Sequence, residues 1–83
     1  MDIKAPEGIL SGKYTNMMQV SHSPEEFILD FISAYPPGGE VVSRLIVSPR
    51  HMKRIVRALM DNIGKYEQIH GLITEASEPK LLS

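Results

Sequence analysis

The segment that decides the fold is Ser48–His70, SPRHMKRIVRALMDNIGKYEQIH. Ser48 followed by Pro49 predicts a helix start, because serine caps a free backbone N–H and proline is tolerated at the first helical position. Apolar and aromatic side chains then recur every three or four residues, at Met52, Ile55, Val56, Leu59, Ile63, Tyr66 and His70. We therefore predict one long amphipathic helix over about 49–70, with Gly71 as its C-cap.

The charges at the start of this helix are reversed from the usual pattern. A helix N-terminus carries partial positive charge and favours acidic residues. Four basic side chains occur there instead, on the side opposite the apolar stripe, and we call them the basic ridge: Arg50, Lys53, Arg54 and Arg57. The simple interpretation is a solvated surface, or pairing with Glu25, Glu26 or Glu40 nearby or across a dimer. The functional interpretation is that the ridge binds an anion, a nucleic acid or an acidic protein partner. Nucleic acid is not favoured, because the formal net charge is −1 and no aromatic residue interleaves with the bases.

Three strands are predicted before the helix, over about 13–22, 26–33 and 40–47. The first and third segments show the alternation and the β-branched residues of strands, and Tyr35–Gly39 (YPPGG) breaks the pattern between the second and third. The second segment has an alternative, because Ser23–Glu26 is also a capping box that would begin a helix over 24–33.

Strand register favours the sheet. Pairing Val20 with Phe27, and Phe31 with Ser43, collects one apolar face for the helix to cover: Met18, Val20, Phe27, Leu29, Phe31, Val41, Leu45 and Val47. The predicted fold class is thus α+β, a three-stranded antiparallel meander followed by one long helix packed on one sheet face. Residues 1–12 are expected to form a flexible arm, 13–71 a single domain and 72–83 a tail in which Leu81 and Leu82 could dock.

The opposite face of this sheet is too apolar for a face left in water. It would place Asp30 beside Arg44 across two strands. The simple interpretation is a tolerated exposed surface; we favour a back-to-back homodimer or higher homo-oligomer through Met17, Ile28, Asp30, Ile32, Val42, Arg44 and Ile46. Self-association also suits an 83-residue chain with no cysteine. A small protein without disulfide bonds has a marginal core and often gains stability by associating with itself.

Catalytic and cofactor chemistry are not indicated. His22, His51 and His70 lack the spacing of metal ligands, no serine–histidine–aspartate set is suggested by the topology, and no glycine-rich phosphate loop occurs. We expect no enzyme activity, no metal and no cofactor. Residues 1–6 do not resemble a signal peptide and no apolar run reaches membrane-spanning length, so a cytoplasmic location is expected. The function prediction is a non-catalytic oligomeric binding or adaptor protein, with anion or nucleic-acid binding through the basic ridge as the alternative.

Two blocks, Tyr14–Phe31 and Arg44–Glu67, resemble a family of short bacterial and archaeal proteins of unknown function, DUF3467. The shared motifs are Asn16, Gln19–Pro24 (QVSHSP), Phe27–Phe31 (FILDF), Val47–His51 (VSPRH) and Asn62–Glu67 (NIGKYE). The resemblance implies a small cytoplasmic prokaryotic protein and transfers no activity, ligand or catalytic residue. It draws attention to His22, Asp30 and His51. Gly64 stands where a stronger helix former would be expected, so the last turns of the helix are less certain than its start.

Overall fold

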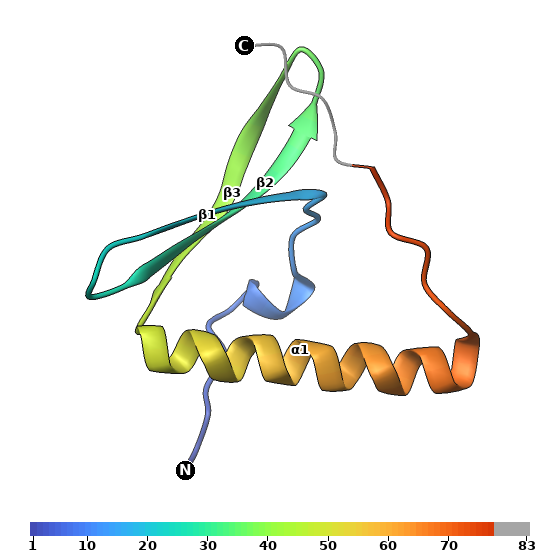
Figure 1. Cartoon of the computed structure of the whole chain (residues 1–83). Helices are drawn as coiled ribbons and strands as arrows, with labels where there is room; N and C mark the ends of the chain where they lie inside the picture. The colour runs from blue at the N-terminus through green and yellow to red at the C-terminus, as the bar shows by residue number, and fades with distance from the viewer. Residues whose placement is uncertain (78–83) are drawn as a thin grey trace.

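The protein, described by a computed structural model over residues 1–77, is an antiparallel meander followed by one long helix (Figure 1). The sheet order is β1-β2-β3. Its elements are η1 (Ile9–Ser11), β1 (Met17–His22), β2 (Phe27–Tyr35), β3 (Gly38–Val47) and α1 (Pro49–His70). The predicted α+β class is confirmed, and the residues 24–33 left open between strand and helix form most of β2.

The predicted strand register is correct in the second hairpin and wrong in the first. Between β2 and β3, Phe31 lies opposite Ser43 and Leu29 opposite Leu45, as predicted. Between β1 and β2, Val20 pairs with Leu29 rather than with Phe27, so the predicted register is wrong by two residues. A two-residue slip keeps every side chain on its face, because side chains alternate with period two.

A β-bulge in β3 changes the face assignment at one end of the sheet. The register shifts between Phe31 and Ile32, so that Ile32 lies opposite Val41 and Val42 becomes the extra residue. Val41 therefore shares the face of Ile32. The prediction had placed Val41 on the helix-covered face and Val42 on the other, and the bulge reverses that assignment for Val41.

The side chain of Asn16 extends the sheet beyond the first residue of β1. Its Oδ1 accepts from the N–H of Ala34 at 2.8 Å, and its Nδ2 donates to the Ala34 carbonyl at 3.1 Å. The backbone N–H of Asn16 donates to the carbonyl of Ile32 at 3.1 Å. The amide thus takes the place of a peptide group, which lets β1 begin at Met17 rather than near residue 13 while both polar groups of Ala34 are satisfied.

Helix α1 begins and ends as the sequence predicts. The Ser48 hydroxyl accepts from the N–H of His51 at 3.2 Å, and Pro49 occupies the first turn. At the other end, Gly71 has φ 90° and its N–H donates to the Glu67 carbonyl at 3.0 Å. A residue with a Cβ is strained at that φ, which explains glycine there. The helix continues through Gly64 to His70.

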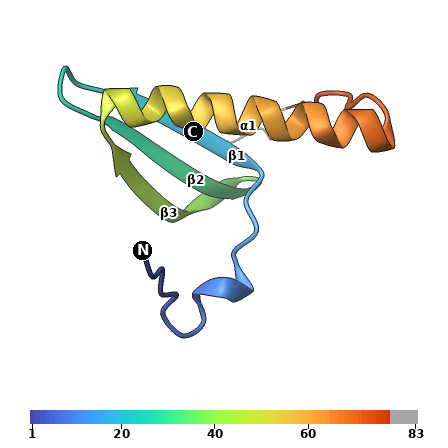
Figure 2. The same ribbon diagram turned by 90° about the horizontal axis from the view of Figure 1, so that it is seen from below.

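The predicted packing of α1 on the sheet is only partly realised. Figure 2 shows α1 running along one side of the sheet and projecting beyond it. Met52 and Ile55 are half-buried, but no residue of the 22-residue helix is buried. Strands β2 and β3, of nine and ten residues, are about as long as the 22-residue helix, so the low burial reflects how few helix side chains lie close to the sheet. Leu59 still lines the gap between helix and sheet with Leu29 and Phe31, and we call the part of the helix after it, residues 60–70, the overhang.

The hydrophobic core of the protomer is correspondingly small. Only Leu29, Ile32 and Ala34, all on the central strand β2, are buried hydrophobic residues in the described chain. The exposed residues of the described chain include the N-terminal arm at residues 1–12 and most of the apolar stripe of α1.

Replacing Asn16 with alanine should destabilise the fold by about 1–3 kcal/mol, because the N–H and carbonyl of Ala34 lose their partners. Urea unfolding followed by circular dichroism measures this change. Gln19→Ala, at an exposed position in β1, is the matched control and should shift the midpoint little. Equal midpoints for the two variants would show that the Asn16 amide adds nothing to the sheet.

Candidate interaction surfaces

Asp30 and Arg44 form a two-pronged ion pair across β2 and β3. Arg44 donates from Nε to Oδ1 at 2.7 Å and from Nη2 to Oδ2 at 2.9 Å. The predicted cross-strand pair is therefore confirmed. The Arg44 hydrogen bond lowers the pKa of Asp30 below its ordinary value of 3.8, and the same contact raises the pKa of Arg44 above its ordinary value. Asp30 is 15% exposed and Arg44 60% exposed at the side chain, so the pair lies at the surface of the protomer.

The other residues predicted for the sheet interface are spread over different environments. Ile32 is buried, at 6% exposure, and Met17 and Ile28 are half-buried. Ile46 is 57% exposed. Val42, displaced by the bulge, lines a pocket with residues of the N-terminal arm. The apolar patch that a second copy or another protein could contact on this face is thus centred on Ile46 and Val41 rather than on Ile32.

The basic ridge is exposed along the first half of α1. All four of its arginine and lysine side chains are in the exposed class. In the part of the chain that the structure describes, the Asp30–Arg44 bridge is the sole ion pair, so Glu25, Glu26 and Glu40 do not pair with the ridge within a protomer. In the described chain, the side-chain hydrogen bond made by a ridge residue is between Arg54 Nη2 and His51 Nδ1, at 3.2 Å.

A groove runs between α1 and the sheet face that it covers. One part of about 500 Å³ is lined by Phe27, Pro49, Met52, Lys53, Val56 and Arg57. A neighbouring part of about 450 Å³ includes Leu29, Phe31, Ile55 and Leu59. The groove is apolar at its floor, and Lys53 and Arg57 of the basic ridge stand at its rim. Sequence periodicity gave no signal for it, because the pattern predicts a covered face and not a gap.

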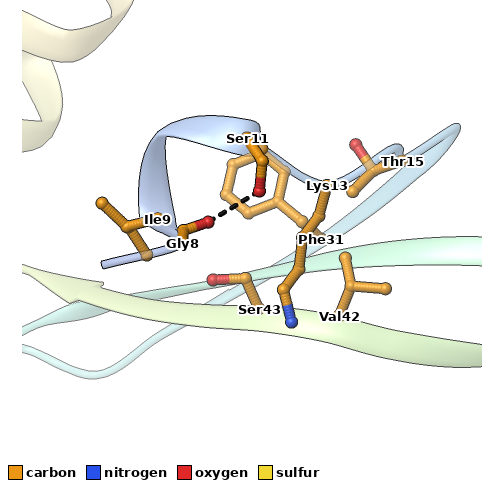
Figure 3. Close-up of a pocket in the computed structure, with 9 residues that line it drawn as sticks. Gly8, Ile9, Ser11, Lys13, Thr15, Phe31, Val42 and Ser43 are labelled. Carbon is orange, nitrogen blue, oxygen red and sulfur yellow. Dashed lines mark hydrogen bonds between the residues drawn. The ribbon is translucent and has the colours of Figure 1, made fainter. Parts of the chain in front are cut away.

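A second pocket lies between the arm and the sheet (Figure 3). The arm and α1 lie on the same side of the sheet in Figure 1, and Phe31 lines both this pocket and the groove. Lys13, Ser11 and Ser43 supply its polar groups, but the Ser11 hydroxyl already donates to the Gly8 carbonyl at 2.7 Å. The arm predicted as loose contains one turn, η1, and faces β2 and β3 across this pocket.

The histidines remain separate from one another. His22 stacks on Phe27, with ring centroids 5.4 Å apart, and His70 lies against Tyr66 at 4.7 Å. Over residues 1–77, no group of three or more histidine, aspartate or glutamate side chains could hold a metal ion. Within the same range, no helix has both the length and the apolar character needed to cross a membrane.

The fold defines a small α+β protein with a short meander and an incompletely covered helix. The chain belongs to the family described as Protein of unknown function (DUF3467), whose model matches residues 1–75. The match extends the resemblance seen in two sequence blocks through the N-terminal arm. No curated protein and no solved structure matches the chain.

The Asp30–Arg44 pair should make stability depend on acid pH. The folded protein holds the Asp30 proton less tightly than the unfolded chain does, because the pKa of Asp30 is lowered. The contribution of Asp30 is therefore fully present above its unfolded pKa, near 3.8, and is lost as the pH falls through the lowered pKa. Urea midpoints of the wild type and Asp30→Asn should differ at pH 6 and converge toward pH 2.5. A constant difference across that range would contradict this reasoning; Asp61→Asn is the control.

Reversing one charge of the basic ridge should stabilise the isolated helix start. Arg50→Glu places a carboxylate in the first turn, where the helix dipole favours it, and should raise the unfolding free energy by roughly 0.3–1 kcal/mol. Thermal unfolding at low ionic strength measures the change. Arg50→Gln, which only removes the charge, should give a smaller gain. A loss of stability in both variants would mean that Arg50 contacts an acidic group in the assembled protein.

Proposed function

We propose that this protein is a non-catalytic binding module that works as a homo-oligomer. The observation that carries the proposal is helix α1, which has an apolar stripe along 22 residues and no buried residue. Its uncovered side chains include Leu59 at 59%, Tyr66 at 50% and Ile69 at 76% exposure. An apolar surface of this extent on a small protein marks a contact site.

The small hydrophobic core supports a permanent contact between copies of the chain. Three buried hydrophobic residues in the described chain contribute little against the conformational entropy of ordering a domain. The chain has no cysteine and so no disulfide staple. A protein that needs a partner to complete its core requires one at matching concentration, and a second copy of the same chain meets that condition at any expression level.

The free sheet face offers a second contact in this proposal. Val41 and Ile46 are 53% and 57% exposed on that face, and the Asp30–Arg44 pair lies between apolar neighbours. A further copy or a protein partner bound there would bury them, as the sequence predicts for Met17, Ile28 and Ile46. The proposal also includes a cytoplasmic location and a prokaryotic source, which rest on the family resemblance.

Light scattering coupled to size exclusion tests the proposal directly. At micromolar concentration we expect a mass of at least two chains of 9.3 kDa. Because folding and association are coupled, the urea midpoint should also rise with protein concentration. A monomer of 9.3 kDa that unfolds cooperatively at a concentration-independent midpoint would overturn the proposal.

Anion binding at the basic ridge is the second candidate. The observation that favours it is the exposure of all four cationic side chains with no ion pair to an acidic residue in the described chain. Such a surface attracts phosphate-rich polymers or acidic proteins. It is compatible with the first proposal for Arg50 and Arg54, which lie on the side of α1 opposite the apolar stripe, whereas Lys53 and Arg57 border the groove.

Salt dependence separates these candidates. If all four ridge residues contact phosphates of a labelled duplex, affinity should fall about 100-fold between 50 and 200 mM salt. Arg50→Glu/Arg54→Glu should abolish binding, whereas Lys65→Glu, farther along the same helix, should have a smaller effect. Binding that persists in the double variant would exclude the ridge as the site.

A further inference from the structure

The outer flank of α1 carries a strip of side chains that is complementary to itself. The strip consists of Lys53, Val56, Met60, Ile63 and Glu67. These residues are three or four positions apart, so they lie in one line along the helix. The order is one cation, three apolar residues and one anion, and Met60 stands at the centre with Lys53 and Glu67 seven residues to either side.

Four of the five residues of the strip are exposed in the protomer, and Glu67 is half-buried. Val56, Met60 and Ile63 are 50%, 64% and 45% exposed, and Lys53 is exposed as well. Ile55, which is half-buried on the sheet side, lies about 140° around the helix from Met60. A partner on the strip would therefore leave the contact of Ile55 with the sheet in place.

We propose that two copies of this chain pair through this strip with their α1 helices antiparallel. In that arrangement Met60 meets Met60 of the second copy, and Lys53 lies opposite Glu67 of the second copy, twice by symmetry. Val56 and Ile63 stand on either side of Met60, so Val56 of each copy lies near Ile63 of the other in this arrangement. Lys53 and Glu67 lie at the two ends of the contact.

Charge complementarity selects a second copy in this orientation over a parallel one. Parallel helices would bring Lys53 against Lys53 and Glu67 against Glu67, with repulsion at both ends. Antiparallel helices convert both contacts into attraction and also oppose the two helix dipoles favourably. Glu67 is positioned for this contact because its Oε2 accepts from the N–H of Ile73 at 2.9 Å, which holds the carboxylate at the helix surface.

The overhang explains why the pairing would complete the fold. Leu59, Ile63, Tyr66 and Ile73 line a shallow pocket beyond the sheet, where the protomer offers no further cover. An antiparallel partner brings its own N-terminal half, with Val56 and the groove floor, alongside this overhang. Each copy then covers the part of the helix that the other cannot cover, as a two-fold symmetric interface requires.

Cross-linking gives the first test, because the chain contains no cysteine. Met60→Cys should form a covalent dimer with a short bis-maleimide at micromolar protein. Ala58→Cys is the matched control, since it is exposed but lies on the opposite side of the helix, and it should give at most a trace of dimer. Efficient cross-linking at Ala58 with none at Met60 would overturn the pairing.

Charge exchange gives the second test. Lys53→Glu and Glu67→Lys should each weaken the homodimer by roughly tenfold, because each creates two like-charge contacts. When the two variants are mixed, native mass spectrometry should show a preferred heterodimer, in which both charge pairs are restored. The loss of the Ile73 hydrogen bond in Glu67→Lys is the same alone and in the mixture, so the gain on mixing reports only the contact between copies.

The helix pairing rests on the proposed homo-oligomer. The experiments distinguish a wrong pairing from a wrong oligomer proposal. Cross-linking at Ile46→Cys with none at Met60→Cys and no heterodimer preference would move the interface to the sheet face. That result would overturn the helix pairing and leave a homo-oligomer. A wild-type monomer of 9.3 kDa would overturn both.

Discussion

The structure depends on how little of helix α1 the sheet covers. The helix carries an apolar stripe over all of its roughly six turns. Only Met52 and Ile55 of that stripe are half-buried, although β2 and β3 are nine and ten residues long. Burial is the main favourable term in folding, and here it is concentrated on Leu29, Ile32 and Ala34 of the central strand. The remaining apolar surface of the helix is available for an interaction outside the protomer.

This constraint connects the features of the surface. The groove and the overhang both result from a helix that meets the sheet only near Met52 and Ile55. The basic ridge follows from the same helix, because charged residues that cannot face the sheet are placed opposite the stripe. Asp30 and Arg44 satisfy one another at the centre of the other sheet face, so that face can be left in water or covered at little electrostatic cost.

The sequence was sufficient to predict the elements and their order, because each depends on local patterns. Serine and proline at 48 and 49 define the helix start, and alternation together with a shared face identifies β2 as a strand although its first residues resemble a helix cap. The slip in the first hairpin escaped prediction because a two-residue shift preserves both faces. The bulge at Val42 and the amide of Asn16 escaped it because both depend on backbone geometry across strands, which no single-strand pattern encodes. Likewise, the stripe predicts an apolar contact for α1 but not how much of that contact the chain itself supplies.

The β-bulge has one more consequence, for the kind of assembly that this chain can form. In a three-stranded sheet β1 and β3 are edge strands, and edge strands can recruit further strands into open-ended aggregates. The extra residue Val42 interrupts the regular row of hydrogen-bonding groups on β3, and β1 is only six residues long. Both edges are therefore poor templates for strand addition. In the oligomer proposed above, contacts between side chains are therefore favoured over the addition of strands, which would build fibres.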